Sequence, residues 1–241
     1  MESQIKNLII ISIDNLRPDC IEANPNKQLL NKYKLSIKPK TPTLDWFVNN
    51  GVFFNQCITV APYTTTAHAS ILTGQWPHKH GIIDFFGSKL STPTIFEILR
   101  KEKFSTLFQA DFPFILGPNM GFDKGIDKFV DSNENESYEW IKKNIKKPLA
   151  CFFHFANVHS PYGFHDLTHD GNNYRKKVNS LIKKYKIKPD IKALDGKQYI
   201  MKDLSNEEKI LKQNYDKVLQ KIHELKQYDQ IMDLYIEGPT P

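Results

Sequence analysis

Residues 7–14 read N-L-I-I-I-S-I-D, a continuous β-branched apolar run closed by an acid. A run of this kind predicts a strand buried on both faces, as in a parallel sheet. Asp14 then lies at the carboxyl end of the strand, the edge at which ligands bind in open α/β sheets. A similar run, L-A-C-F-F-H-F-A-N at residues 149–157, leads to His159. The two runs therefore predict a sheet edge that carries an acid and an imidazole.

Strand-like and helix-like segments alternate along the chain with short connections, which predicts an α/β fold with a mostly parallel sheet flanked by helices. Further strands are expected at Gly51–Val60, Phe104–Gln109 and Gln230–Ile236. Helices are expected after Thr41-Pro42-Thr43, over Thr64–Leu72, after Ser91-Thr92-Pro93, over Glu134–Lys146 and over Leu204–Gln227. Lys176–Lys188 is expected to form a basic helix or an extended arm. Residues 119–130 are expected to form a glycine-punctuated loop.

The composition indicates a folded globular protein. A hydrophobic fraction of 40% over 241 residues is enough for a real core, which excludes global disorder. The net charge of +6 fits an anionic substrate or a nucleic acid, but solvated lysine-rich helix faces explain it better, so nucleic-acid binding is unlikely. Three scattered cysteines fit a reducing compartment. Because the apolar run at residues 8–13 is too short for a signal peptide or a membrane span, we expect a cytoplasmic protein.

The segment from Ala61 to Gly81 gathers five serine and threonine residues and three histidines. Within it, Thr64–Leu72 predicts a short helix that ends at Gly74, with Thr64 in its first turn. A hydroxyl there faces helix N–H groups and the positive end of the helix dipole, where an oxyanion is stabilised. The simpler interpretation is that the threonines cap the helix and the histidines lie on a surface loop.

Three side chains are thus expected at one edge of the sheet: Asp14 after the first strand, Thr64 at the helix start and His159 after the last apolar strand. A carboxylate, a hydroxyl and an imidazole suit attack on a phosphate or sulfate ester. The carboxylate binds a divalent cation, the cation activates the hydroxyl, and the imidazole holds the anion or protonates the leaving group.

Several motifs resemble those of the sulfatases, a family of the alkaline-phosphatase-like superfamily. N-L-I-I-I-S-I-D-N-L-R-P-D (7–19) looks like the opening strand and "D-D-x-R-x-D" metal corner, and residues 41–57 look like "T-P-N-L-D-x-L-A-x-x-G-x-x-F". T-T-T-A-H-A-S-I-L-T-G-Q-W-P-H-K-H-G-I (64–82) resembles the nucleophile helix "C/S-x-P-S-R-A-S-L-L-T-G-x-x-P-x-x-H-G". Residues 121–127 look like "G-F-D-x-x-x-D", and residues 152–163 look like the strand that leads to "H-x-P-H".

This resemblance implies roles for five residues. Asp14 and Asn15 would be metal ligands, and Thr64 would contact the same metal and attack the ester. His68 stands where the motif has arginine and would be catalytic, and His159 would contact the substrate anion. The cation would be calcium, with manganese or zinc as alternatives, and the substrate a small anionic sulfate or phosphate ester.

The chain also departs from the family pattern. Without cysteine at position 64, the formylglycine mechanism is excluded, and Thr66 replaces the motif proline. Asn15 replaces a metal-binding aspartate, and Tyr162 replaces the second histidine of "H-x-P-H". The late "D-H/N-G" metal element is not found, so further ligands would have to come from other acids, for which the candidates are Asp84, Asp111 and Asp233.

Two hypotheses of function remain open. The first is a metal-dependent hydrolase of sulfate or phosphate esters. The second is a truncated, catalytically inactive relative that acts as a binding module. In both, the resemblance implies an alkaline-phosphatase-like fold shortened at the C-terminus. We expect a single domain over residues 1–241, with the motifs in residues 1–165 and a diverged lysine-rich helical part in residues 166–241. The sequence says nothing about the oligomeric state.

Overall fold

The computed structural model describes residues 7–28, 30–84, 88–160, 162, 167–193 and 205–237. The chain divides into two compact units. Unit 1 comprises residues 1–14 and 57–155, and unit 2 comprises residues 15–56 and 156–241. The expected single domain, with a change of character near residue 165, stays a prediction. Each unit is described by itself.

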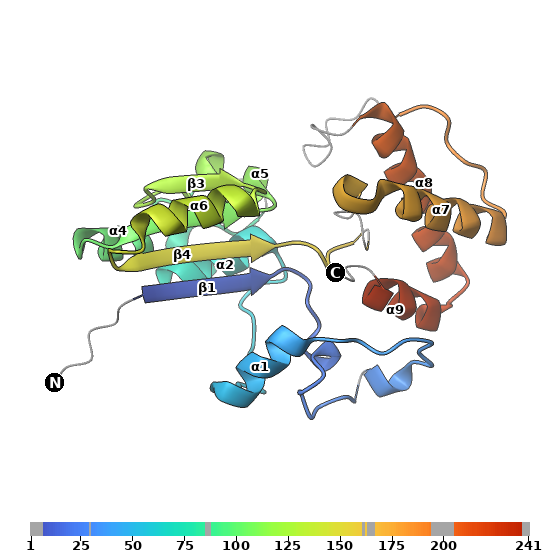
Figure 1. The fold of residues 1–241 in the computed structure, drawn as a ribbon, viewed down its shortest axis with the longest axis horizontal. Helices are drawn as coiled ribbons and strands as arrows, with labels where there is room; N and C mark the ends of the chain where they lie inside the picture. The colour runs from blue at the N-terminus through green and yellow to red at the C-terminus, as the bar shows by residue number, and fades with distance from the viewer. Residues whose placement is uncertain are drawn as a thin grey trace. The chain divides into compact units, whose positions relative to one another are not determined.

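Unit 1 is built on a sheet of four strands: β1 (Asn7–Ile13), β2 (Ser105–Ala110), β3 (Lys128–Asp131) and β4 (Leu149–Phe155). The strand order is β1-β4-β2-β3, and every paired neighbour is parallel (Figure 1). The strands expected near residues 7–14, 104–109 and 149–157 are confirmed, as is the mostly parallel α/β fold. β3 was not expected, because its four residues lie at the end of the predicted glycine-punctuated loop.

Helices cover both faces of this sheet. On one face, Trp140 and Ile141 of α6 (Glu134–Asn144) pack against a cluster that contains Leu107 and Cys151. The other face carries α2 (Thr64–Thr73) and α4 (Ile95–Lys101), with Phe96 of α4 next to Phe108. Figure 1 shows α6 and α2 on opposite sides of the strands. The short helices α3 (Pro77–His80) and α5 (Pro113–Leu116) complete unit 1 with the 3-10 turn η3 (Pro118–Met120).

The ends of α2 follow from local chemistry. The helix begins at Thr64, and it ends at Gly74, whose φ of 67° is left-handed. Glycine adopts this conformation without the steric cost that other residues incur. The next helix of this face, α4, begins later than expected, because Thr94 and Glu97 form the capping box instead of residues 91–93.

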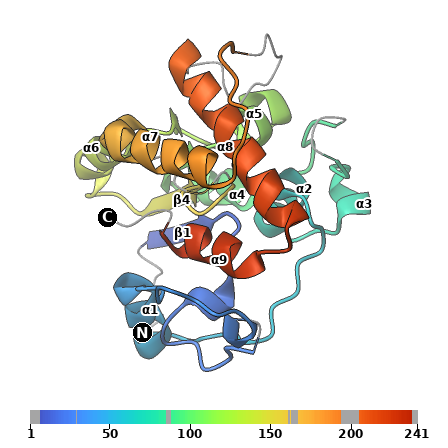
Figure 2. The same ribbon diagram turned by 90° about the vertical axis from the view of Figure 1, so that its right-hand side faces the viewer.

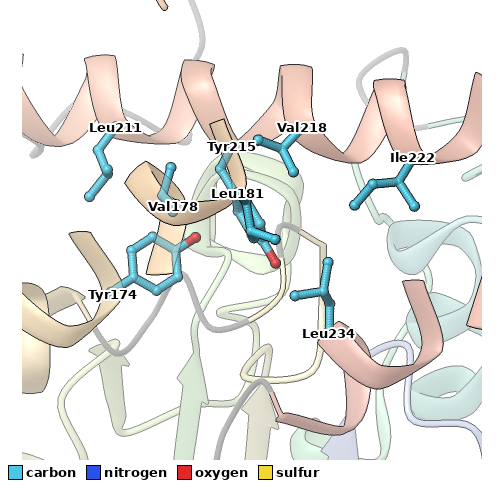
Figure 3. Packing of buried hydrophobic residues seen from close by; sticks show 8 residues of the cluster. All are labelled: Tyr174, Val178, Leu181, Leu211, Tyr215, Val218, Ile222 and Leu234. Atoms are coloured by element: carbon cyan, nitrogen blue, oxygen red, sulfur yellow. The ribbon is translucent and has the colours of Figure 1, made fainter. Parts of the chain in front are cut away.

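Unit 2 is helical. It contains the turns η1 (Pro18–Cys20) and η2 (Leu30–Lys32) and the helices α1 (Pro42–Asn50), α7 (Leu167–Lys184), α8 (Asn206–Glu224) and α9 (Tyr228–Glu237) (Figure 2). Its larger core lies between α7, α8 and α9, as Figure 3 shows. The buried members of this core are Tyr174, Val178, Leu181, Leu211, Tyr215, Val218, Ile222 and Leu234.

The long charged helix expected over Leu204–Gln227 is confirmed as α8. Ser205 and Glu208 form a reciprocal capping box at its start. Helices in the described part of unit 2 are too polar or too short to cross a membrane, and the same holds for those in unit 1.

Two expected strands are wrong. Residues 51–60 form no strand, and Val52, Phe54 and Ile58 are 81%, 76% and 91% exposed. A β-rich run becomes a strand only beside a partner strand, and none lies next to it among the described residues. Residues 230–236 belong to the helix α9, which buries Met232, Asp233, Leu234 and Tyr235. An apolar run this short does not distinguish a strand from a buried helix.

Candidate active site

The first contact of the site joins the end of β1 to the start of α2. The Asp14 N–H donates to the Phe155 carbonyl oxygen at 2.8 Å, which extends the β1–β4 pairing by one residue. This pairing fixes Asp14 at the carboxyl edge of the sheet. Thr64, the first residue of α2, donates from Oγ1 to Asp14 Oδ2 at 3.0 Å. The structure therefore brings together two of the residues that sequence analysis placed at this edge.

A third side chain, His154, reaches the same carboxylate. His154 lies on β4 with its side chain fully buried, and its Nε2 lies 3.3 Å from Asp14 Oδ2. Its other ring nitrogen, Nδ1, is buried without a hydrogen-bond partner among the described residues. His154 was not among the expected site residues, although its strand was predicted. The available signal was a histidine flanked by phenylalanines in a strand predicted to be buried.

His68 lies one turn further along α2. Its Nδ1 is 2.7 Å from the Thr64 carbonyl oxygen, and its Nε2 is 2.8 Å from Ser12 Oγ on β1. The ring also packs edge-on against those of Phe152 and His154. Burial lowers the pKa of His68 to about 4, because desolvation penalises the charged form. His68 is therefore neutral at pH 7, unlike the arginine that the motif has at this position. Its expected catalytic role stays a prediction.

The start of α2 provides a positive electrostatic environment around Thr64. The first N–H of the helix bonded to a preceding carbonyl is that of Ala67, which donates to Tyr63 at 2.9 Å. The backbone N–H groups ahead of it have no intrahelical acceptor, and they sum to a partial positive charge. Because Thr64 stands in this turn, a negative charge that develops near its hydroxyl is stabilised.

The other two expected site residues, Asn15 and His159, belong to unit 2. Asn15 adopts a left-handed φ of 61°, and its carbonyl oxygen accepts a hydrogen bond from Tyr235 Oη at 2.8 Å. His159 has Nδ1 at 2.6 Å from the Ser160 carbonyl oxygen. Their roles as metal ligand and anion contact stay predictions.

The described residues hold no cluster of acids, cysteines and histidines that fits a divalent metal ion. Calcium takes six to eight oxygen ligands, and zinc takes at least three protein side chains. Asp14 and Thr64 offer neighbouring oxygens, but no group of three or more His, Cys, Asp or Glu in the described ranges is placed to hold a metal ion. Asp233, one candidate for a further ligand, accepts from the Ser36 N–H and hydroxyl, both at 2.8 Å. The other two candidates, Asp84 and Asp111, belong to no such group among the described residues.

Comparison with known families agrees with this fold. The family model named Sulfatase matches residues 6–146, more than half of the chain. The chain therefore belongs to the sulfatase family. Members of this family generally use divalent metals. The match begins at β1 and includes α2, so it contains the segments that supply Asp14 and Thr64.

Individual relatives match only in part. An arylsulfatase of Clostridium perfringens (strain 13 / Type A) is 30% identical over 79 residues, which are 33% of this chain and 14% of the arylsulfatase. Among solved structures, a protein in complex with its substrate D-glucosamine-2-N,6-O-disulfate has a TM-score of 0.55 and 15% identity, over 98% of this chain and 58% of the other. A protein from work on glycosaminoglycan metabolism by Bacteroides thetaiotaomicron has a TM-score of 0.50 and 14% identity, over 92% and 59%.

These structural likenesses show the fold, which is alkaline-phosphatase-like as expected. The chain spans less than three fifths of the length of both solved structures.

Proposed function

We propose that unit 1 carries the attacking group of a sulfatase-like hydrolase of sulfate or phosphate esters. The attacking atom is Thr64 Oγ1, and the Asp14 carboxylate receives its proton. The observation that carries this proposal is the 3.0 Å hydrogen bond between Thr64 Oγ1 and Asp14 Oδ2 at the start of α2. It joins a weak nucleophile to a base within the distance that proton transfer requires.

In the proposed step, the substrate is an aryl phosphate. Thr64 Oγ1 bonds to phosphorus while the bond from phosphorus to the aryl oxygen breaks, and the aryl group leaves as phenolate. The proton of the Thr64 hydroxyl passes to Asp14. Water then attacks the phosphothreonine, and Asp14 returns its proton to Thr64 Oγ1 as that oxygen leaves, which releases inorganic phosphate and restores the hydroxyl and the carboxylate. The first turn of α2 stabilises the negative charge that develops on the transferred group.

The proposed step assigns no role to a divalent cation, and the assay tests whether calcium, manganese or zinc changes the rate. A calcium, manganese or zinc ion at Asp14 and Thr64 would need further ligands, and the described ranges hold no group of three or more His, Cys, Asp or Glu that could supply them. Asn15 keeps its proposed role as a second ligand, and His159 keeps its role as a contact for the substrate anion.

The test is an assay of purified protein with aryl phosphate, aryl sulfate and a sulfated amino sugar. Each substrate is tested in EDTA and with added calcium, manganese or zinc. We expect turnover by the wild type, loss of turnover in Thr64→Ala and partial activity in Thr64→Ser, which keeps the hydroxyl. Thr73→Ala, at the other end of the same helix, is the control and should match the wild type. Equal rates in Thr64→Ala and the wild type would refute the proposal.

The second candidate function is a binding module without catalysis. It is favoured by the incomplete set of ligands for a divalent metal in the described residues, since sulfatase-family members generally use such a metal. Calorimetry with phenyl phosphate separates the two candidates. Binding that Thr64→Ala weakens, together with no turnover above that variant under any metal condition, would favour the binding module.

A further inference from the structure

Strand β1 contacts Thr64 by two separate routes. Asp14 accepts from the Thr64 hydroxyl directly, at 3.0 Å. Ser12, two residues earlier, reaches the Thr64 carbonyl oxygen through the His68 ring, with contacts of 2.8 Å and 2.7 Å. Both the side chain and the backbone of one residue are therefore fixed against the same strand.

The partners of His68 determine which ring nitrogen carries the proton. The Thr64 carbonyl oxygen is only an acceptor, so the contact at Nδ1 requires an Nδ1–H donor. In the neutral ring Nε2 then carries a lone pair, and it accepts from the Ser12 hydroxyl. The ring packs edge-on against Phe152 and His154, both on β4, and only 6% of the residue is exposed. Both nitrogens are thus used in holding α2 to β1, and neither is left for a substrate.

We propose that Ser12 and His68 are positioning residues that set the attack geometry of Thr64. This inference rests on the proposed function of Thr64. The chain of contacts runs from Ser12 Oγ–H to His68 Nε2, and from His68 Nδ1–H to the Thr64 carbonyl oxygen. It fixes the first turn of α2, so that the Thr64 hydroxyl points to Asp14 without contact between His68 and substrate.

The positioning matters because attack depends steeply on geometry. Thr64 is the first residue of α2, and helix ends fray unless they are tied down. A displacement of about 1 Å at a reacting group costs on the order of a hundredfold in rate. Loss of either hydrogen bond should therefore lower kcat and leave KM nearly unchanged.

Two substitutions at His68 separate the two bonds. His68→Asn places an amide N–H near the position of Nδ1, so it keeps the donor to Thr64 and loses the contact with Ser12. His68→Gln extends to the position of Nε2, so it keeps an acceptor for Ser12 and loses the donor to Thr64. With aryl phosphate, we expect kcat to fall about tenfold in His68→Asn and about a hundredfold in His68→Gln. Ser12→Ala should lower kcat about tenfold in the wild type and have no effect in His68→Asn.

The matched control lies on the same helix. Ser70 Oγ and His80 Nε2 form a contact of 2.8 Å, the same length as that of Ser12 with His68. Ser70→Ala should lower the melting temperature but leave kcat at the wild-type value. A rise in KM with constant kcat in His68→Gln would place His68 in contact with substrate and overturn the inference. Wild-type kcat in Ser12→Ala would also overturn it.

Nitrogen-15 NMR of the wild-type protein tests the contacts without any turnover or substitution. We expect the neutral ring of His68 to show a protonated Nδ1 and an unprotonated Nε2, and the reverse tautomer would overturn the inference. If the wild type turns over no substrate, the proposed function fails by itself. The NMR result then still decides whether the Ser12–His68–Thr64 chain of contacts exists.

Discussion

The threonines of α2 are of two kinds. Thr66 is 1% exposed, and its hydroxyl has no hydrogen-bond partner among the described residues. Thr73 donates from its hydroxyl to the Ala69 carbonyl oxygen at 2.7 Å. A buried hydroxyl without a partner pays for desolvation without compensation, whereas a bonded hydroxyl contributes to stability.

We therefore predict opposite effects of the same substitution at these two positions. Thr66→Val should raise the free energy of unfolding by about 1 kcal/mol, because a methyl group replaces the unpaired hydroxyl. Thr73→Val should lower it by about 1 kcal/mol, because a bond is lost. Urea denaturation of both variants measures the difference. A loss of stability in Thr66→Val as large as that in Thr73→Val would contradict the prediction.

The buried ring of His68 predicts a pH dependence of stability. Its pKa is about 4 in the folded protein, against the ordinary value of 6.5. Between pH 4 and pH 6.5 the unfolded chain binds a proton at His68 more readily than the folded protein does. The free energy of unfolding is therefore highest above pH 6.5 and falls as the pH drops toward 4. The full loss is on the order of 3 kcal/mol. Unfolding curves between pH 4 and 7 measure it, and the slope should be smaller in His68→Asn. An equal slope in both proteins would assign the effect to other groups.

The site residues that could be predicted from the sequence are those at the end of a predicted strand or at the start of a predicted helix. Asp14 ends an apolar run and Thr64 begins a helix, so both could be placed at the sheet edge, where the structure brings them together. His154 could not be assigned to the site, because its contact with Asp14 depends on the pairing of β1 with β4. The neutral state of His68 could not be predicted either, because it depends on burial.

At the scale of elements, α9 holds the segment that begins unit 2. Tyr235 Oη accepts from the Arg17 N–H at 2.9 Å and donates to the Asn15 carbonyl oxygen at 2.8 Å. Burial raises the pKa of Tyr235 to about 12, so the hydroxyl keeps its proton. One phenol thus bridges the two ends of a turn that contains a left-handed asparagine.

Removal of this hydroxyl should loosen the turn. We predict that Tyr235→Phe lowers the free energy of unfolding by about 1 to 2 kcal/mol, because two backbone groups lose their partner. Hydrogen exchange should speed up at the Arg17 amide in the same variant. Tyr228→Phe is the control, since that ring lies in the same helix and is 44% exposed. Unchanged exchange at Arg17 in Tyr235→Phe would show that the phenol does not hold the turn.

Helix boundaries were predictable where the caps are local. Thr41-Pro42 and Gly51 enclose α1, and Ser205 with Glu208 begins α8, as the sequence indicated. The strand expected at residues 51–60 was wrong because strand formation depends on a neighbour that no local pattern reveals. The helix α9 was missed because its apolar residues fit both periods.

At the scale of the whole molecule, β1 forms one edge of the sheet among the described strands. β1 is the first strand in the order, and its sequence N-L-I-I-I-S-I contains no charge and no proline. Ile9 and Ile11 are 55% and 49% exposed. Exposed apolar edge strands promote association between chains, and natural proteins usually protect them with charges or proline.

A charge on this edge should reduce self-association. We predict that the wild type forms larger species as its concentration rises, and that Ile11→Lys shifts the distribution toward the monomer. Sedimentation velocity measures both. Ile145→Lys, which adds the same charge at a residue that is 66% exposed outside the sheet, is the control. Equal shifts in the two variants would attribute the effect to net charge and not to the strand edge.

The class of the fold was predictable, but its topology was not. Alternation of apolar strands with capped helices indicated a parallel sheet, because such strands are buried on both faces. The order β1-β4-β2-β3 depends on contacts between distant segments, such as the hydrogen bond from the Leu149 N–H to Asn7 Oδ1, 142 residues apart. Local patterns carry no information about such pairs.

The same strand order affects how the chain is made. β1 is paired only with β4 among the described strands. The ribosome must therefore translate everything between them before the first strand has its neighbour. At about 5 to 20 residues per second, this delay lasts on the order of ten to thirty seconds. Throughout that time the emerging chain carries an uncharged isoleucine-rich segment that nothing in the sheet covers. A trigger-factor-type chaperone that binds such segments should therefore raise the soluble yield in cell-free synthesis.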